Sequence, residues 1–509
     1  MKNLKRLMVA LLTLVLSFSA VSAVSAAGNG SITVEGATEG KTYEIYKIFD
    51  LTYSGTNVAY TIDSNWVSFF NGDGAKYISD TNTGGLNPIT IGNTTKYINI
   101  TESNKVKFSE AALAYIAKNN LAANKTQTAG EGETTVQFTG LDLGYYLVYP
   151  KGATDIKKGE STICTLTSTM PSITVNVKAT YPTITKTADD ESVDAGQIVE
   201  FTIKGQVPTT TGYNKYTYII SDTWTGGLEF VSEEFDFTVK FGPEGSQTKI
   251  EVTPNYTYAD EAKTIVNGFT LEFDMTKYQN YKGQEIIVTY NLKVTEDAIT
   301  TTTNNSATLT YSNNPKDAED KEVTPPVIVK LYSSEIIVDK YEDGSESTKL
   351  SGAQFILSKV NEDRETVYYR ALDADGKLMT STDTTSIYTT TGVDKVEWTT
   401  DKDAATVLTT NAEGKVEFKG IENGNYSLIE TKAPEGYNLL PEPKEITVQP
   451  KEEATTKSVS LTEKVANSTG TRLPTTGGFG TTLFITIGSL LALASAIILI
   501  TNKRISKEF

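Results

Sequence analysis

The sequence predicts an all-β protein built from three Ig-like β-sandwich domains in tandem. Short segments rich in threonine, valine, isoleucine and tyrosine alternate apolar and polar residues, as at 31–35 and 285–290, which is the period-two pattern of half-buried strands. Clusters of glycine, asparagine and aspartate, such as residues 71–74, separate these segments as turns. Prolines at residues 178–182 and 324–327 cannot join a central strand ladder, so they indicate two domain boundaries.

The first 27 residues predict a signal peptide. Lys2, Lys5 and Arg6 precede an apolar run over residues 7–18, and small residues at 24–27 close the segment. This order is typical of a cleaved secretory signal, and the run is shorter than the roughly 20 residues that span a bilayer. We therefore exclude residues 1–27 from the fold and expect the rest of the chain to be secreted.

The C-terminal segment 469–509 contains three features in order. It begins with the pentapeptide Leu473, Pro474, Thr475, Thr476 and Gly477. An uncharged apolar run over residues 479–500 and a short basic tail follow, and basic residues stay on the cytoplasmic side of a membrane. This arrangement resembles the LPxTG sorting signal of sortase substrates in Gram-positive bacteria. The resemblance implies an apolar sorting helix, cleavage between Thr476 and Gly477, and transfer of the Thr476 carbonyl to an amine.

The composition excludes several classes of function. The formal net charge is −17, so nucleic acid is not an expected partner. The absence of histidine removes Ser-His-Asp and Cys-His catalysis and histidine-ligated metal sites. We expect no enzyme activity, no cofactor and no metal site. The single cysteine rules out an intrachain disulfide, so this secreted chain needs another source of stability.

The two boundaries divide the mature chain into domains 28–179, 180–328 and 329–468. An internal repeat relates the first domain to the third, because residues 136–148 align without a gap with residues 416–428. Continuing that register places Pro150 opposite Glu430. The clearest helix is expected in the first domain at residues 109–119, with Ser109 as its N-cap.

The third domain carries a lysine, a glutamate and an asparagine in three separate strand-like segments. Lys340 lies in the first segment, Glu430 in a middle segment and Asn467 in the last. This order, with the segment 426–437, resembles the collagen-adhesin B-type domains of Gram-positive pilins. The resemblance implies a spontaneous isopeptide bond between Lys340 and Asn467, with Glu430 as the catalytic acid.

Strand parity supports the same residues independently. Side chains two positions apart share one face of a strand, so each of the three faces the core beside the apolar residue before it, which is Val338, Leu428 or Val465. Burial disfavours the charged forms of lysine and of carboxyl groups, and a neutral amine is a nucleophile. The amine attacks the asparagine side chain, helped by a hydrogen bond from the acid to the carbonyl, and ammonia leaves. The alternative is an ordinary buried ion pair with an asparagine nearby.

The middle domain repeats this pattern with Lys186, Asp222 and Asn305. Lys186 and Asn305 share strand faces with apolar residues, whereas Asn304 shares its face with threonines, so Asn305 is preferred. The segments around Asp222 and Asn305 resemble the middle domain of backbone pilins, where aspartate replaces glutamate. The resemblance implies a second isopeptide bond, from Lys186 to Asn305, with Asp222 as the acid. The alternative assigns Asp222 to a turn cap and Asn305 to a loop.

The first domain lacks the acid, because Pro150 stands opposite Glu430, and we expect no isopeptide bond there. The tripeptide Tyr149, Pro150 and Lys151 resembles the lysine motif of pilins. In that family the lysine amine receives the threonine carbonyl of the next subunit, which implies Lys151 as acceptor and Thr476 as donor. An ordinary surface lysine is the alternative for Lys151. The nearby alternative acceptors are Lys157 and Lys158.

Together these features resemble the major (backbone) subunit of a sortase-assembled pilus. The resemblance implies a secreted, cell-wall-anchored, extracellular pilus of identical subunits joined head to tail, which supports adhesion. The implied partners are a pilin-type sortase, a housekeeping sortase, tip and base pilins, and peptidoglycan. One alternative is a monomeric wall-anchored adhesin that binds host matrix, which shares every feature except Lys151. A second is a wall-anchored enzyme that acts through two carboxylates.

Overall fold

The computed structural model describes residues 28–470 apart from short gaps, together with residues 487, 489 and 491. The gaps are residues 55–56, 84–85, 154, 157–162, 168–169, 178, 232–236, 264–265, 301–302, 381–387, 390–391 and 451–456. The expected signal peptide, the pentapeptide 473–477, all but three residues of the apolar run 479–500 and the alternative acceptors Lys157 and Lys158 therefore lie outside the described residues.

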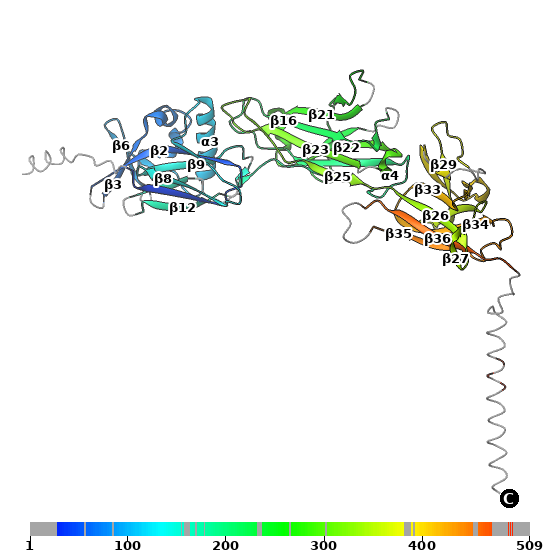
Figure 1. Cartoon of the computed structure of the whole chain (residues 1–509). Coiled ribbons are helices and arrows are strands. Elements are labelled where there is room, and N and C mark those ends of the chain that lie inside the picture. The colour runs from blue at the N-terminus through cyan, green and yellow to red at the C-terminus, as the bar shows by residue number, and fades with distance from the viewer. Residues whose placement is uncertain are drawn as a thin grey trace, which may run out of the picture. The chain divides into compact units, whose positions relative to one another are not determined.

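The described residues form β-sheets almost throughout (Figure 1), which confirms the predicted all-β class. The chain divides into two compact units. Unit 1 contains Met1–Glu191, Ile198–Lys293 and Thr303–Lys330, and unit 2 contains Ser192–Gln197, Val294–Thr302 and Leu331–Phe509. The division into three domains stays a prediction, and we describe each unit by itself.

The N-terminal part of unit 1 has two main sheets around one apolar core. The smaller has the order β12 (Ser172–Asn176), β1 (Gly30–Glu35), β8 (Thr135–Leu141). In it β1 runs parallel to β12 and antiparallel to β8. The larger has the order β11 (Ile163–Leu166), β9 (Gly144–Pro150), β2 (Thr42–Ser54), β3 (Asn57–Ile62), β5 (Pro88–Ile91), β6 (Thr94–Ile98), β4 (Ile78–Ser79), with β7 (Lys125–Thr128) on β2. A separate pair joins β10 (Asp155–Ile156) and β13 (Ala179–Thr180).

Helix α3 (Lys105–Lys118) begins four residues before the predicted start, with Asn104 as its N-cap. The expected cap at Ser109 is wrong, because the Ser109 hydroxyl donates to the Lys105 carbonyl at 2.9 Å inside the helix, which satisfies a serine at an interior position. The buried residues of α3 are Phe108, Ser109, Ala112 and Ile116. The short helical turns before it are η2 (Ser64–Trp66), α2 (Val67–Phe70) and η3 (Ala75–Tyr77).

The second part of unit 1 contains two six-stranded sheets. The first has the order β14 (Thr185–Ala188), β15 (Ile198–Gln206), β22 (Glu285–Val294), β18 (Thr238–Gly242), β19 (Thr248–Lys249), with β17 (Leu228–Glu229) on β22. The second has the order β20 (Asn255–Tyr258), β21 (Val266–Asp274), β16 (Thr217–Trp224), β23 (Thr303–Ser312), β24 (Lys321–Val323), with β25 (Val327–Leu331) on β23. Buried residues alternate along β22 and β23, so one face of each strand lines the core. The turn η4 (Met275–Tyr281) precedes β22. Helix α4 (Asp297–Thr300) lies between β22 and β23 in the sequence and belongs to unit 2.

Unit 2 repeats the two-sheet plan around its own apolar core. One sheet has the order β27 (Ser345–Lys349), β26 (Ser334–Glu342), β33 (Lys415–Ile421), β30 (Tyr388–Thr389), with β36 (Ser460–Asn467) on β26. The other has the order β31 (Lys395–Thr399), β29 (Thr366–Leu372), β28 (Gln354–Val360), β34 (Gly424–Lys432), β35 (Lys444–Val448), with β32 (Leu408–Thr409) on β28. The turn η5 (Lys402–Ala404) lies before β32. Strand β26 runs parallel to β36 and antiparallel to β33, as β1 does with β12 and β8.

Among the described residues, no helix is both long enough and apolar enough to cross a membrane.

Candidate functional site

The first candidate site lies in the core of unit 2, between its two sheets. Lys340 lies on β26 and Asn467 ends β36, so the parallel pairing of these strands brings both residues to one end of the same sheet. Glu430 comes from β34 in the facing sheet, where it pairs with Phe355. The Lys340 and Glu430 side chains are fully buried, and Asn467 is buried beside them. The structure therefore brings together the three residues that strand parity directs into the core.

The three side chains form one hydrogen-bonded cluster. The Lys340 Nζ donates to Asn467 Oδ1 and, at 3.2 Å, to the Val465 carbonyl, and it lies 3.7 Å from Glu430 Oε1. The Asn467 Nδ2 donates to Glu430 Oε1 at 2.8 Å. The second carboxylate oxygen, Oε2, accepts from the Leu440 backbone N–H at 2.8 Å. The amine thus lies against the amide that it would attack, and the carboxylate is fixed by two donors.

The contact of the carboxyl group differs from the sequence-based expectation. We expected the acid to donate to the asparagine carbonyl, but Lys340 occupies that oxygen and Glu430 contacts the amide nitrogen. That detail of the prediction is wrong, because sequence parity fixes the face of a strand and not the pairing of atoms across the core. The observed contact places Glu430 beside the nitrogen that would leave as ammonia, where a proton is required.

Burial changes the chemistry of the lysine. Desolvation lowers the pKa of Lys340 to about 8, although the neighbouring Glu430 carboxylate opposes the shift. A lysine with a lowered pKa has a larger fraction of neutral, nucleophilic amine near neutral pH.

The second candidate site lies in the second part of unit 1. Lys186 lies on β14, Asp222 on β16 and Asn305 on β23. Strands β16 and β23 are neighbours, with Trp224 opposite Asn305 and Asp222 opposite Ala307, so the acid and the amide lie in one sheet. Asn305 is fully buried, and it is the member of the Asn304–Asn305 pair that contacts the lysine.

Lys186 contacts both of its expected partners. Its Nζ donates to Asp222 Oδ2, with both side chains fully buried, and to Asn305 Oδ1 at 2.7 Å. Burial lowers the pKa of Lys186 to about 8, although Asp222 opposes the shift. Burial also raises the pKa of Asp222, against the opposing effects of Lys186 and Tyr290. Both shifts favour the neutral amine and the neutral acid.

Sequence reasoning missed Tyr290, which completes this second site. Tyr290 lies on β22 and is fully buried. Its hydroxyl donates to Asp222 Oδ1 at 2.8 Å and accepts from Asn305 Nδ2 at 2.9 Å and from Lys186 Nζ at 2.5 Å. The signal in the sequence was the position of a tyrosine on the apolar face of residues 285–290, since a buried tyrosine hydroxyl usually has a hydrogen-bond partner.

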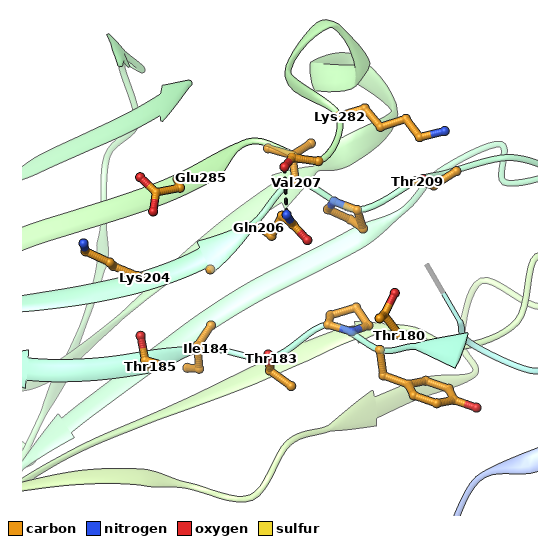
Figure 2. Close-up of a pocket in the computed structure, with 15 residues that line it drawn as sticks. Thr180, Thr183, Ile184, Thr185, Lys204, Gln206, Val207, Thr209, Lys282 and Glu285 are labelled. Atoms are coloured by element: carbon orange, nitrogen blue, oxygen red, sulfur yellow. Dashed lines mark hydrogen bonds between the residues drawn. The ribbon is translucent and has the colours of Figure 1, made fainter. Parts of the chain in front are cut away.

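A pocket of about 650 Å³ opens beside this site, where residues 180–185 diverge from the end of β15 (Figure 2). Its charged lining residues are Lys204, Lys282 and Glu285. None of the three predicted site residues lines the pocket, and the side chains of Lys186 and Asp222 are fully buried.

The N-terminal part of unit 1 carries none of the three reactive residue types at the equivalent positions. Strand β1 pairs with β8 in the register that β26 uses with β33: Val34 lies opposite Val136, and Val338 opposite Val416. The same register, continued along these strands and their pairs with the last strands, makes Gly36 the equivalent of Lys340 and Ala179 the equivalent of Asn467. The sequence repeat makes Pro150 the equivalent of Glu430. Gly36 has a φ of +73°, which favours glycine.

Lys151 directly follows β9 at the edge of that region. Its backbone N–H donates to the Thr42 carbonyl at 2.9 Å, and Tyr149 before it is buried. The Lys151 Nζ forms an ion pair with Asp320 Oδ2 at 2.6 Å, and its side chain is 20% exposed. Burial acts to raise the pKa of Asp320, but hydrogen bonds from Lys151 and Asn313 hold it below its ordinary value. Lys151 therefore has a fixed backbone and, unlike Lys186 and Lys340, a side chain that is partly exposed to solvent.

We predict that isopeptide formation depends on pH through these lysines. Burial lowers the pKa of Lys186 and Lys340 to about 8, so the neutral amine is the minor form below that pH and the major form above it. The rate of ammonia loss should rise up to about tenfold per pH unit towards pH 8 and then level off. Intact mass against time, for unreacted chain refolded from inclusion bodies at several pH values, measures this. A rate that does not change with pH would contradict a neutral lysine nucleophile.

Comparisons with known proteins give relatives for most of the chain. Residues 334–464 match the SpaA family model, a prealbumin-like fold domain. The chain is 26% identical over 431 residues to fimbrial subunit type 1 of Actinomyces viscosus, covering 76% of this chain and 78% of the relative. It is 27% identical over 287 residues to the trypsin-resistant surface T6 protein of Streptococcus pyogenes serotype M6, covering 55% of this chain and 46% of the relative. Among solved structures, the full-length major pilin SpaD from Corynebacterium diphtheriae is similar with a TM-score of 0.44 and 21% identity, covering 87% of this chain and 98% of that chain.

Proposed function

We propose that this protein is the structural backbone subunit of a covalent cell-surface pilus. A pilin-type sortase joins Thr476 of one subunit to Lys151 of the next, and the finished fibre is attached to peptidoglycan and supports adhesion. The similarity to a fimbrial subunit over 76% of the chain supports the general function. The observation that supports polymerisation through Lys151 is that its side chain is partly exposed, whereas the Lys186 and Lys340 side chains are fully buried.

In this proposal two internal isopeptide bonds stabilise the subunit. The neutral amine of Lys340 attacks Cγ of Asn467, the Cγ–Nδ2 bond breaks, and ammonia leaves. Glu430, in contact with Nδ2, supplies the proton that the departing nitrogen needs and takes up the proton that Nζ loses. Lys186 and Asn305 react in the same way, with Asp222 as the acid. The prealigned hydrogen bonds between each amine and its amide support a reaction that needs no enzyme.

The N-terminal region takes part differently. With Gly36, Pro150 and Ala179 at the equivalent positions, it has no lysine, acid or amide for such a bond. We propose that this region instead presents the acceptor lysine. Domain 28–179 then serves polymerisation, and domains 180–328 and 329–468 each contain one internal cross-link.

Two measurements on the wild-type protein test the proposal. Wall extracts boiled in detergent should give a ladder of very large species when probed with antibody to this chain. The purified ectodomain should be lighter than its sequence mass by two ammonia molecules. A single monomer-sized band would instead indicate an anchored adhesin, and a full-mass ectodomain would remove the internal bonds from the proposal.

A further inference from the structure

The two candidate sites differ in how the acid reaches the amide. In unit 2 the Glu430 carboxylate contacts Asn467 Nδ2 directly at 2.8 Å. In unit 1 the acid is Asp222, whose side chain is one methylene shorter, and Asn305 Nδ2 donates to the Tyr290 hydroxyl at 2.9 Å. That hydroxyl in turn donates to Asp222 Oδ1 at 2.8 Å. A tyrosine hydroxyl therefore links the carboxyl group to the nitrogen that has to leave.

Packing holds this hydroxyl in place. The Tyr290 ring is fully buried and lies edge-on to Phe269, with ring centroids 5.0 Å apart. It also stacks with Phe201 at 5.6 Å. The Lys186 Nζ lies over the same ring, 5.2 Å from its centroid. Because the ring is enclosed by aromatic neighbours, its oxygen has a fixed position between the three reactive groups.

We propose that Tyr290 is a catalytic residue for the Lys186–Asn305 cross-link, in which it carries a proton from Asp222 to the departing Nδ2 of Asn305. This inference rests on the proposed isopeptide chemistry and names the group that completes it in the second part of unit 1. The Tyr290 hydroxyl contacts atoms of the nucleophile, of the acid and of the amide.

The atoms balance as follows. Asp222 takes a proton from the Lys186 ammonium, and the neutral amine attacks Cγ of Asn305. A Cγ–Nζ bond forms and the Cγ–Nδ2 bond breaks. Tyr290 gives its hydroxyl proton to Nδ2 and receives one from Asp222, so that ammonia leaves and the tyrosine is unchanged. The lysine nitrogen loses two protons in all. The first passes through Asp222 and Tyr290 to ammonia, and Asp222 takes the second from Nζ after the attack and keeps it.

The electrostatics of the hydroxyl agree with a role in proton relay. Burial and the neighbouring Asp222 carboxylate raise the pKa of Tyr290 well above its ordinary value. The hydroxyl therefore keeps its proton until a basic nitrogen develops as the carbon–nitrogen bond breaks.

Tyr290→Phe tests the proposal, because it keeps the ring and removes only the hydroxyl. Formation of the Lys186–Asn305 bond should slow by about 100-fold or more, which is the usual contribution of a general acid–base group. The bond in unit 2 should form at the wild-type rate and serves as an internal control for folding. Early after refolding, the variant should therefore lack one ammonia where the wild type lacks two, and tandem mass spectrometry should assign the missing cross-link to Lys186 and Asn305.

Two further variants separate proton relay from packing. Tyr218→Phe removes the hydroxyl of another fully buried tyrosine, on β16, and should react at the wild-type rate. Asp222→Glu in the Tyr290→Phe background lengthens the acid by one methylene, to the length of Glu430. This double variant should form the Lys186–Asn305 bond again.

Equal rates for Tyr290→Phe and the wild type would overturn the proposal, as would an equal slowing in Tyr218→Phe. A double variant that stays unreacted would also overturn it, because the tyrosine would then be needed for something other than linking the acid to the amide. A wild-type ectodomain of full mass would instead contradict the proposed isopeptide chemistry on which this inference rests, and it would leave the polymer untouched.

Discussion

Lys151→Ala should reduce the detergent-resistant ladder of the wild-type strain to a single monomer-sized species. The reason is that each added subunit needs one acceptor amine, and alanine at residue 151 removes it while leaving the backbone hydrogen bond to Thr42 available. The ion pair with Asp320 is lost as well, but a partly exposed pair contributes only about 1 kcal/mol or less, so the fold should persist. Immunoblots of boiled wall extracts and of culture medium measure the effect.

The matched control is Lys41→Ala. Lys41 also forms an ion pair with the 313–323 segment, through Glu322, and its side chain is similarly shielded. This variant should keep the ladder. A ladder that persists in Lys151→Ala would move the acceptor to Lys157 or Lys158, which single alanine substitutions then distinguish.

Glu430→Gln should abolish the internal bond of unit 2. Glutamine keeps the shape and hydrogen-bonding capacity of the side chain but cannot hold and deliver the proton that the leaving nitrogen needs. The ectodomain should then be lighter than its own sequence mass by one ammonia, whereas the wild type should be lighter by two. The cross-linked residues are 127 positions apart, and by analogy with a disulfide that closes a loop of that length, the free energy of unfolding should fall by about 5 kcal/mol.

Intact mass, guanidinium denaturation and trypsin digestion measure the two effects together. Glu435→Gln is the control, because Glu435 is an exposed glutamate in the turn just after β34. It should lose two ammonia molecules, as the wild type should, and match the wild type in stability. A Glu430→Gln ectodomain that still loses two ammonia molecules would contradict the assignment of Glu430 as the acid.

Much of the fold could be predicted because a strand has only two faces. Alternation along residues 285–290 indicated β22 and its inward side, and the same parity directed Lys340, Glu430 and Asn467 towards one core. It also separated Asn305, which contacts Lys186, from Asn304. The repeat between residues 136–148 and 416–428 corresponds to equivalent strands, β8 with β33 and β9 with β34.

What could not be predicted depends on distances between strands that are remote in sequence. Tyr290 lies 68 positions from Asp222 and 15 from Asn305, and nothing in its own segment distinguishes it from a core tyrosine. Which amide atom faces Glu430 depends on rotamers across the core. The start of α3 was misjudged because the Ser109 hydroxyl bonds within the helix rather than capping it.

The parallel pairing of first and last strands also determines how a pulled subunit responds. In unit 2 the chain enters at the start of β26 and leaves after the end of β36, which are opposite ends of one parallel ladder. A force along that ladder loads its hydrogen bonds in shear, all at once. The proposed Lys340–Asn467 bond would carry the load past this ladder. In the proposed fibre the N-terminal region is pulled from Lys151, which follows β9, so β1 lies outside the loaded stretch of chain and a cross-link between the positions of Gly36 and Ala179 would carry no load.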